Sequence, residues 1–457
     1  MSNTENKSLS KIVNDLTKPL KNHKGFVIWI FFLAMLIMNG LVAYYGQLKT
    51  GLGATAMSDY VSWGLYISSF IFFVATALVG MLISSVLGLL GIKWITPIAR
   101  ISEMVALGFV MLAGIVIVLD MGRPERLLNV FFHARMQSPI FWDVTVVTFY
   151  VLISTLLFLL PLIPDIPFLQ KTMKDQPKWK QMIYKMLSFG WIGSEDQYKI
   201  IKRSMRILAI LIIPVAMGIH TVTSWLFAMT PRIGWDSTIF GPYYVTGAFV
   251  AGAAAVIIVM YIIRENYKIK EYITDMHFDK MGKLLVLVML VYLYFNVNEY
   301  IVPGYKMKHG DDVHLLSLFT GHYALMFWLV QIGGLIIPII LLLFKPFRKP
   351  LPSLIIGIAI VIGAFFKRYI ITIPTLVHSH LPADNVPASY TEYWPTATEW
   401  SITFMAIALA VLIITILAKL FPIMPIWEIA HENGISNHEM NLYIENKQED
   451  AEEIELP

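Results

Sequence analysis

Ten long apolar runs constrain this chain more than any other feature of its sequence. Each run is long enough to cross a hydrocarbon core of about 30 Å as an α-helix. Because a backbone in lipid has to satisfy its own hydrogen bonds, helices are the expected form of such runs. The runs lie near residues 25–45, 61–90, 97–119, 139–163, 204–230, 244–264, 283–301, 319–344, 351–374 and 396–420. The sequence therefore predicts an all-α integral membrane protein with ten transmembrane helices.

The distribution of charge predicts the orientation of these helices. Only 14% of the 457 residues are charged, whereas soluble domains have about 25%. Five lysines lie within residues 1–24 and eight lysines and arginines within 164–203, but none lies within 375–395. The positive-inside rule then places both termini in the cytoplasm. We expect a multi-pass protein of a bacterial inner membrane, and nothing in this charge balance indicates nucleic acid.

The chain contains no cysteine. Thiolate-held iron–sulfur clusters and Cys-x-x-Cys-His haem attachment both require cysteine. Haem b would need paired histidines that face each other inside a bundle, and His220 is the one histidine placed well inside a span. We therefore expect no haem, no iron–sulfur cluster and no resident metal on this chain.

A short internal repeat suggests how the spans are grouped. Tyr60-Val-Ser-Trp-Gly-Leu-Tyr opens the second span, and Tyr244-Val-Thr-Gly-Ala-Phe-Val opens the sixth. The repeat predicts two four-helix bundles, made of spans 2–5 and 6–9, with spans 1 and 10 as peripheral helices. The expected divisions are a cytoplasmic tail (1–24), a peripheral helix with an outer loop (25–60), the first bundle (61–230), the second bundle (231–374), the last peripheral helix (375–430) and an acidic cytoplasmic tail (431–457).

Polar residues gather at the predicted outer end of the first bundle. Trp63 and Tyr66 are three residues apart and therefore share a face of the second span. Asp120 ends the third span, Arg123 follows about one turn later, and His133 lies in the loop before the fourth span. Interfacial anchoring explains the aromatics equally well, and a surface ion pair that fixes the loop explains the charges. A polar binding site is the functional alternative.

Asp143 and His220 carry the stronger functional signal, because ionisable groups inside spans are costly and are usually retained for function. Both side chains can exchange protons, and histidine does so near neutral pH. An apolar slot with aromatic walls, an acid and a histidine suits the headgroup of a quinol. Its two hydroxyls need acceptors, and its oxidation releases two protons.

Five segments in order resemble one known family. They are Trp63-Gly-Leu-Tyr-Ile, Asp120-x-Gly-Arg-Pro-Glu-Arg, Ser138-Pro-Ile-Phe-Trp-Asp143, Pro214-x-Ala-x-Gly-Ile-His220-Thr and Trp235-x-Ser-Thr-Ile-Phe-Gly-Pro-Tyr. The family is NrfD, the membrane subunit of polysulfide reductase, and the likeness extends from about residue 20 to 420. Within it, the chain looks most like the larger quinol-oxidising subunit of alternative complex III.

The resemblance implies a quinol pocket in the first bundle and no redox cofactor on this chain. The substrate would be menaquinone or ubiquinone. The implied partner is an iron–sulfur protein on the outer face, with a molybdopterin-like subunit, multihaem cytochromes c, and a second NrfD-like or other small membrane subunit as further components. The pocket residues carried over are Trp63, Tyr66, Asp120, Arg123, His133, Asp143 and His220, with Asp143 and His220 as the catalytic pair.

Charged groups in the second half of the chain resemble those proposed to line a proton route in this family. They are Glu299, His322, Lys367, Arg368 and Glu399. Salt bridges between helices account for them equally well. Two further functions also stay open at this point. The same fold serves a quinone-reducing anchor of a molybdopterin-type enzyme, and intramembrane charges with a repeat also occur in secondary transporters.

Overall fold

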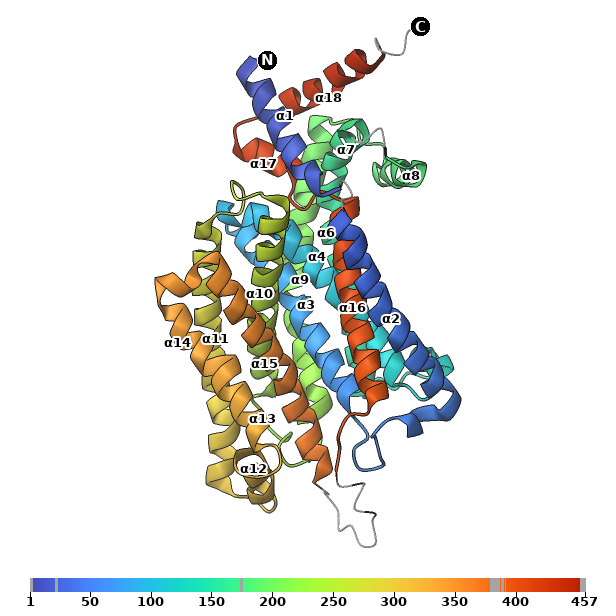
Figure 1. Cartoon of the computed structure of the whole chain (residues 1–457), viewed down its shortest axis with the longest axis vertical. Helices are drawn as coiled ribbons and strands as arrows, with labels where there is room; N and C mark the ends of the chain where they lie inside the picture. The colour runs from blue at the N-terminus through green and yellow to red at the C-terminus, as the bar shows by residue number, and fades with distance from the viewer. Residues whose placement is uncertain are drawn as a thin grey trace.

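The computed structural model describes residues 3–20, 24–172, 176–378, 387, 390 and 392–452. Within these ranges the chain forms helices and no strand. Ten helical stretches are long and apolar enough to cross a membrane, which confirms the predicted all-α membrane fold. The helices run roughly side by side, and the described parts of both terminal segments lie at the same end (Figure 1). This arrangement agrees with an even number of spans.

The membrane helices follow the predicted runs. In chain order they are α2 (Lys24–Thr50), α3 (Leu65–Leu89), α4 (Thr96–Asp120), α6 (Pro139–Leu159), α9 (Glu195–Ala228), α10 (Phe240–Tyr267), α11 (Asp275–Lys306), the composite of α13 (Ala324–Trp328), η6 (Leu329–Ile336) and α14 (Ile337–Leu343), α15 (Pro350–Val377) and α16 (Ala397–Leu420). The η6 segment is a π-helix.

Shorter helices cover both ends of the membrane region. At the predicted inner end lie α1 (Asn3–Thr17), η1 (Lys18–Leu20), η3 (Lys93–Ile95), η5 (Leu160–Asp165), α7 (Ile166–Thr172), α8 (Lys178–Leu187), η7 (Lys345–Arg348), α17 (Ile426–Glu432) and α18 (Asn437–Glu452). At the opposite end lie η2 (Gly51–Ala54), η4 (Pro124–Arg126), α5 (Asn129–Phe132) and α12 (Asp311–Phe319). The tail expected after residue 430 is thus largely helical, and residues 453–457 lie outside the described ranges.

The repeat predicts two groups of helices, and contacts occur both within and between these groups. The first group consists of α3, α4, α6 and α9, and the second of α10, α11, the α13–α14 composite and α15. The groups meet where α3 and α9 pack against α10 and where α3 packs against α15. Helices α2 and α16 pair with each other outside the groups, and α16 also lies against α4. Most of α3 and α10 is therefore buried at the seam between the two groups.

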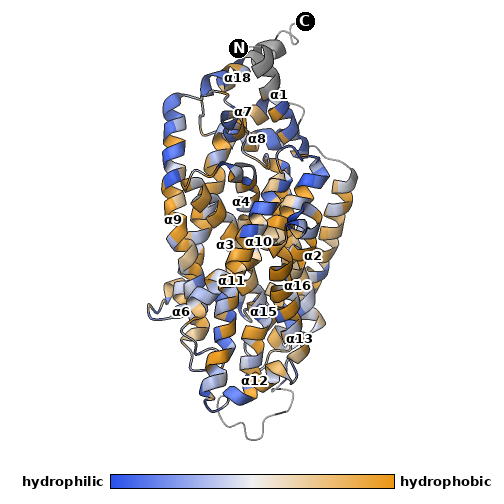
Figure 2. Cartoon of the chain, turned by 90° about the vertical axis from the view of Figure 1, so that its left-hand side faces the viewer, coloured by the Kyte–Doolittle hydropathy of each residue, from blue (hydrophilic) through white to orange (hydrophobic). Residues whose placement is uncertain are grey.

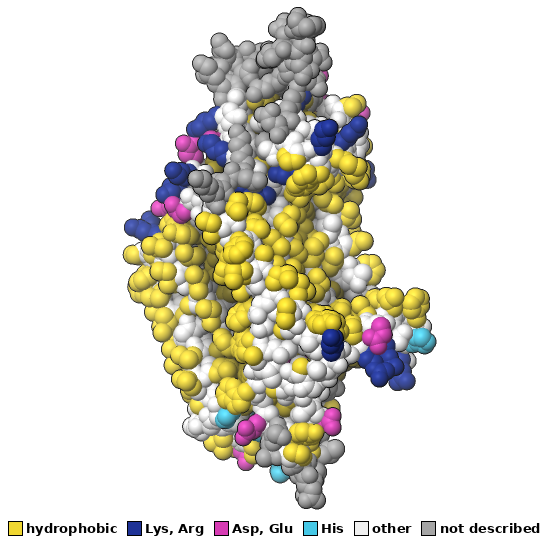
Figure 3. All heavy atoms as spheres, turned by 45° about the vertical axis from the view of Figure 1, so that its right-hand side comes forward, with side chains coloured by type: hydrophobic (Ala, Val, Ile, Leu, Met, Phe, Trp, Pro, Cys, Tyr) yellow, Lys and Arg dark blue, Asp and Glu magenta, His cyan; other side chains and the backbone are white. Residues whose placement is uncertain are grey.

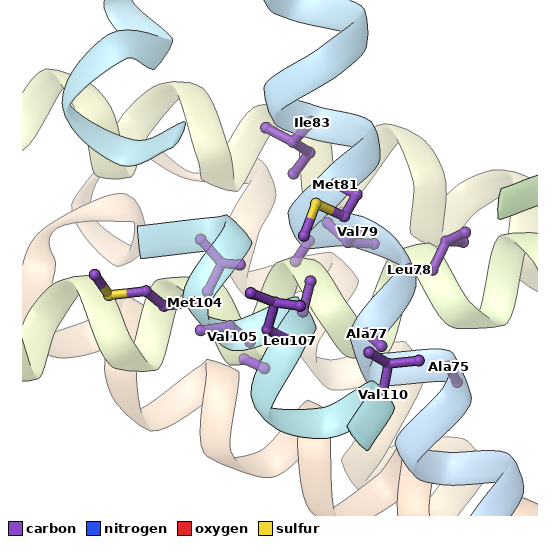
Figure 4. Close-up of a cluster of buried hydrophobic side chains, with 14 of the residues drawn as sticks. Ala75, Ala77, Leu78, Val79, Met81, Ile83, Met104, Val105, Leu107 and Val110 are labelled. Carbon is purple, nitrogen blue, oxygen red and sulfur yellow. The ribbon is translucent and has the colours of Figure 1, made fainter. Parts of the chain in front are cut away.

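Small residues allow α3 and α4 to approach closely. A Cβ atom at Gly80 would lie 1.9 Å from the carbonyl oxygen of Ser102, so only glycine fits at this contact. Close to it, Leu78 and Met81 of α3 and Val105 of α4 form part of a continuous apolar cluster (Figure 4). Close approach through small residues is the usual means of helix association in lipid.

Helices α9 and α11 begin well before the apolar runs that predict them. The fifth run was expected to begin at residue 204, but α9 begins at Glu195 because Ser194 and Gln197 form a capping box. Helix α11 begins at Asp275, where Thr274 and His277 form a similar cap. Capping supplies partners for the first backbone N–H groups, so these helices extend beyond the apolar region as hydrophilic turns (Figure 2).

The outer surface of the helices agrees with a membrane location. Hydrophobic side chains cover much of the middle of the face shown in Figure 3, and several lysine and arginine side chains lie above them, toward the end of the two termini. The orientation of this end toward the cytoplasm stays a prediction from the positive-inside rule.

Candidate functional site

Helix α9 presents its buried polar face to the interior of the first bundle. His220 is 2% exposed and Asp143 of α6 is 3% exposed. Thr223 lies three residues after His220, and its hydroxyl donates a 2.5 Å hydrogen bond to Oδ1 of Asp143. Residues three apart share a helix face. Asp143 and His220 therefore lie on neighbouring helices, and Thr223 links Asp143 to the face of α9 that carries His220.

Three buried polar atoms on helices that pack at the seam between the bundles have no hydrogen-bond partner among the described residues. They are Nε2 of His220, the hydroxyl of Tyr244 and Nε of Arg368. The guanidinium of Arg368 lies 5.8 Å from the centre of the Tyr244 ring and interacts electrostatically with His220. Buried polar groups normally have partners. This cluster can therefore offer hydrogen bonds to a bound polar group.

An aromatic group borders this cluster on the predicted outer side. The ring of Trp63 lies 5.3 Å from that of Phe227 and 5.8 Å from that of Trp235. Phe227 in turn lies 6.0 Å from Tyr244. The indole of Trp235 is fixed by a 2.7 Å hydrogen bond to the carbonyl oxygen of Ile371. Trp63 is thus placed beside the seam as part of a rigid aromatic wall.

Tyr66 and Asp120 belong to a different cluster. The Tyr66 hydroxyl donates a 2.7 Å hydrogen bond to Oε1 of Gln47, and Nε2 of Gln47 donates to the carbonyl oxygen of Leu119 at 2.8 Å. Asp120 interacts electrostatically with Glu399 of α16. These contacts turn the two residues toward the peripheral helices α2 and α16.

Glu399 caps helix α16 beside this second cluster. Its Oε2 accepts hydrogen bonds from the backbone N–H groups of Ala56 and Thr396 at 3.0 and 2.9 Å, and its Oε1 accepts one from the hydroxyl of Tyr393. Such a saturated carboxylate has a clear structural role. The sequence assigned Glu399 to the last peripheral helix and to a proton route with residues of the second bundle, and the structure places it near Tyr66 of the first bundle.

Arg123 and His133 lie on the surface. Both side chains are exposed, and no hydrogen bond or ion pair joins either of them to another described residue. Their loop also exposes Leu128 at 58% and Phe132 at 77%. The structure therefore does not bring Arg123 and His133 together with His220 and Asp143, because the short helices η4 and α5 turn the loop outward.

The remaining predicted groups divide between the core and the surface of the second bundle. Lys367 donates a hydrogen bond to the Tyr300 hydroxyl and interacts electrostatically with Glu299. Arg368 lies next to Lys367 but belongs to the seam described above. His322 is exposed, and its ring lies 5.0 Å from that of Trp394. These groups do not form one line across the membrane.

A buried amide pair adjoins Lys367 and Arg368. Nδ2 of Asn296 donates a 2.7 Å hydrogen bond to Oε1 of Gln331, and Oδ1 of Asn296 accepts one from Tyr243 at 2.8 Å. Gln331 lies on the π-helix η6. All four helices of the second bundle thus contribute to one polar core, beside a cavity of about 20 Å³ that has room for about one water molecule.

A larger cavity opens at the predicted outer end between α9 and α10. Its volume is about 440 Å³, and its lining includes Trp225, Thr230, Asp236 and Gly241. Neither His220 nor Asp143 lines it, since about one turn of α9 separates His220 from Trp225. Within the described ranges, no cluster of three or more His, Asp or Glu side chains is arranged to hold a metal ion.

Comparison with known proteins identifies the family. The sequence pattern of "Polysulphide reductase, NrfD" matches residues 53–379, a region that contains both four-helix bundles. The chain belongs to the NrfD family. The family resemblance seen in the sequence motifs is thereby confirmed, and the narrower likeness to alternative complex III stays a prediction.

Several NrfD relatives align over most of this chain. A selenate reductase subunit of Mesobacillus selenatarsenatis is 26% identical, with 86% of this chain and 93% of the relative covered. The integral membrane subunit of menaquinone reductase from Nitratidesulfovibrio vulgaris is also 26% identical, with 88% and 92% covered. An Hdr-like menaquinol oxidoreductase integral membrane subunit from Archaeoglobus fulgidus is 22% identical, with 87% and 93% covered. All three are subunits of oxidoreductases.

Sequence reasoning did not assign Thr223, Tyr244 or Gln47 to a site. Thr223 carried a usable signal, since it lies three residues from His220 on the same helix face. Tyr244 was noticed only as part of the repeat. Gln47 lies in the first span, far from the other site residues in sequence, so no local pattern connects it to Tyr66.

Proposed function

We propose that this chain is the quinone-reactive membrane subunit of an oxidoreductase complex. In this proposal it oxidises quinol near the outer face of the bacterial cytoplasmic membrane and passes the electrons to an iron–sulfur partner. The observation that carries the proposal is that His220 Nε2, the Tyr244 hydroxyl and Arg368 Nε are buried without partners, with Arg368 close to the Tyr244 ring and electrostatically coupled to His220. The quinone names of two NrfD relatives support it.

A quinol headgroup would supply what this cluster lacks. One hydroxyl would donate to His220 Nε2, and the Arg368 and Tyr244 groups would donate to the oxygen atoms of the oxidised ring. The aromatic wall formed by Trp63, Phe227 and Trp235 would border the ring. The outer cavity lined by Trp225 gives the headgroup a path between α9 and α10. Binding then requires movement of the intervening side chains.

Oxidation of one quinol releases two electrons and two protons. His220 and Asp143 would accept the protons, and Thr223 would orient the Asp143 carboxylate through its 2.5 Å hydrogen bond. The electrons would leave through the partner, because the chain has no cysteine to hold a cluster. The exposed loop with Arg123 and His133 lies at the predicted outer end and offers a surface for that partner.

The test is quinol-dependent reduction of the partner's iron–sulfur clusters in the purified complex. His220→Ala and Asp143→Ala should each abolish this reduction while the complex still assembles. His309→Ala is the matched control, since His309 is an exposed histidine at the same end of the molecule. Full turnover in both site variants would exclude the proposal.

The reverse direction is a second candidate, favoured by the menaquinone reductase relative. In that case the same site would protonate a reduced quinone, and the chain would anchor a molybdopterin-type enzyme that delivers electrons. The direction is measured by supplying the complex separately with quinol plus an electron acceptor and with quinone plus an electron donor. Faster turnover of quinone would favour this second function. The same assays can be used to determine which type of quinone reacts and whether turnover is coupled to proton translocation.

A further inference from the structure

A second large cavity lies at the opposite end of the first bundle from His220. Its volume is about 470 Å³, within the range of small-ligand sites. The inner ends of α3, α4, α6 and α9 form its walls, and α17 covers it. No step of the proposed quinol chemistry uses this cavity, which is separated from the site by most of the bundle.

Acidic side chains form the covered part of the cavity. Glu103 is 6% exposed and accepts a 2.6 Å hydrogen bond from the hydroxyl of Ser84. Glu428 of α17 lines the same space and has no hydrogen-bond or ion-pair partner among the described residues. Burial raises the pKa of Glu428 to about 7. A carboxylate held in this way favours a cationic ligand, because buried charges need a partner.

Arg100 forms its ion pair with Asp165 and not with these two acids. Its guanidinium forms a 2.5 Å ion pair with Asp165 and donates to the carbonyl oxygens of Pro161 and Met424 at 2.9 and 3.1 Å. Asp165 also accepts hydrogen bonds from the backbone of α17. The direct contacts of Arg100 are therefore with Asp165 and with backbone carbonyl groups, whereas Glu103 and Glu428 interact with Arg100 only electrostatically, without a hydrogen bond or ion pair.

Basic side chains form the rim of the cavity. Lys93, Lys202 and Arg206 line it and are exposed, and none has an ion-pair partner among the described residues. The ammonium of Lys202 lies 5.8 Å from the centre of the Trp427 ring. Unpaired cations at the rim and unpaired anions in the interior thus share one cavity without neutralising each other.

The rim lies next to exposed hydrophobic side chains. Helix α9 changes from hydrophilic to hydrophobic along its length (Figure 2), and Ile207 and Ile210, just after Arg206, are 48% and 53% exposed. Leu90, in the turn that contributes to the rim, is 68% exposed. Apolar chains attached to a headgroup in the cavity would therefore extend directly over hydrophobic surface. A basic pocket between helices on the cytoplasmic side is typical of lipid headgroup sites.

We propose that this cavity binds the headgroup of an aminophospholipid of the phosphatidylethanolamine type from the predicted inner leaflet. The ammonium group points inward to Glu103 and Glu428, and the phosphate binds Lys202 and Arg206 at the rim. Phosphatidylglycerol lacks the cation that the acids require. Phosphatidylcholine has a cation without N–H donors, so it cannot hydrogen-bond to the carboxylates.

The test is lipid retention by the purified complex in mixed micelles with equal amounts of phosphatidylethanolamine, phosphatidylglycerol and phosphatidylcholine, measured by native mass spectrometry. The wild type should retain phosphatidylethanolamine preferentially. Glu428→Gln should lower this preference about tenfold, the loss expected for one charge-assisted hydrogen bond. The double variant Lys202→Gln/Arg206→Gln should lower retention of all three lipids, because it removes the phosphate contacts.

Lys199→Gln is the matched control. Lys199 lies one turn before Lys202 on α9, but it pairs with Asp196 outside the cavity. The control variant should behave as the wild type does. Equal retention of the three lipids by the wild type, or unchanged retention in both site variants, would overturn the proposal. Displacement of the lipid by soluble O-phosphoethanolamine at equal concentration would also overturn it, because the ligand would then be a free amine phosphate.

Discussion

The hydroxyl of Thr223 donates a 2.5 Å hydrogen bond to Oδ1 of Asp143 and so joins α9 to α6 inside the first bundle. Among the described residues, this is the one hydrogen bond of the Asp143 side chain, which also forms no ion pair. Because His220 lies on the same face of α9 as Thr223, one contact fixes the acid relative to the histidine. The proposed proton acceptors thus depend on a residue that has no proton to exchange near neutral pH.

Thr223→Val should lower quinol-dependent turnover about tenfold, since an unsatisfied buried acceptor costs about 1–3 kcal/mol. The valine side chain keeps the volume, so assembly should be unchanged. The measurement is steady-state turnover of the purified complex. Thr221→Val is the control, because the Thr221 hydroxyl donates only to the Met217 carbonyl oxygen of its own helix. Equal turnover of Thr223→Val and the control would contradict this role.

Arg100→Met should lower the free energy of unfolding by about 3–5 kcal/mol, because it leaves Asp165 as an unpaired buried charge. Arg100 and Asp165 are 1% and 0% exposed at their side chains. Arg100→Met/Asp165→Asn should recover part of this loss, since no charge is then buried and the amide oxygen still accepts from the backbone of α17. Thermal unfolding in detergent measures the stability of the single and the double variant. If the double variant is no more stable than Arg100→Met, the unpaired charge of Asp165 is not the cause of the lost stability.

Gly334→Ala should destabilise the second bundle, whereas Gly333→Ala should have little effect. A Cβ atom at Gly334 would lie 2.8 Å from the Cα atom of Gly363 on α15, but one at Gly333 would meet no atom within 4 Å. The clash is with backbone, so α15 and the π-helix η6 would have to separate. The melting temperatures of the two variants give the comparison. Similar melting temperatures for the two variants would contradict the prediction, because α15 and η6 would then separate at little cost in free energy.

Folding stability should fall as the pH decreases from about 6.5 toward 4, in part through His314. Burial, with smaller effects of the His378 and Lys367 charges, lowers the pKa of His314 to about 4. Between these pH values the unfolded chain binds a proton that the folded chain does not, which favours unfolding by about 2 kcal/mol at pH 5. The His314→Gln variant should lack this contribution to the fall in stability at low pH. The His309→Gln variant, changed at an exposed histidine, should retain it. Parallel pH profiles for His314→Gln and the wild type would refute the assignment.

The number and positions of the spans could be predicted because lipid imposes one dominant pattern, the long apolar run. Asp143 and His220 could be named as candidates because charge inside such runs is conspicuous. The neighbours of Tyr66 were not predictable, since Gln47 comes from a helix that reaches it only through packing. The loop with Arg123 and His133 was predicted to form the pocket rim, yet local turns direct it outward. Arg368 was predicted for a proton route, but the bundle seam brings it to His220.

The most direct test of the central claim is photolabelling of the intact complex with an azidoquinone, followed by mass spectrometry of the labelled peptides. We predict label on α9 and α10 between Gly218 and Tyr244, with competition by excess quinone and strong reduction in His220→Ala. A quinone site at the seam would be contradicted if excess quinone suppresses labelling only outside this region, for example at the cavity that contains Glu428.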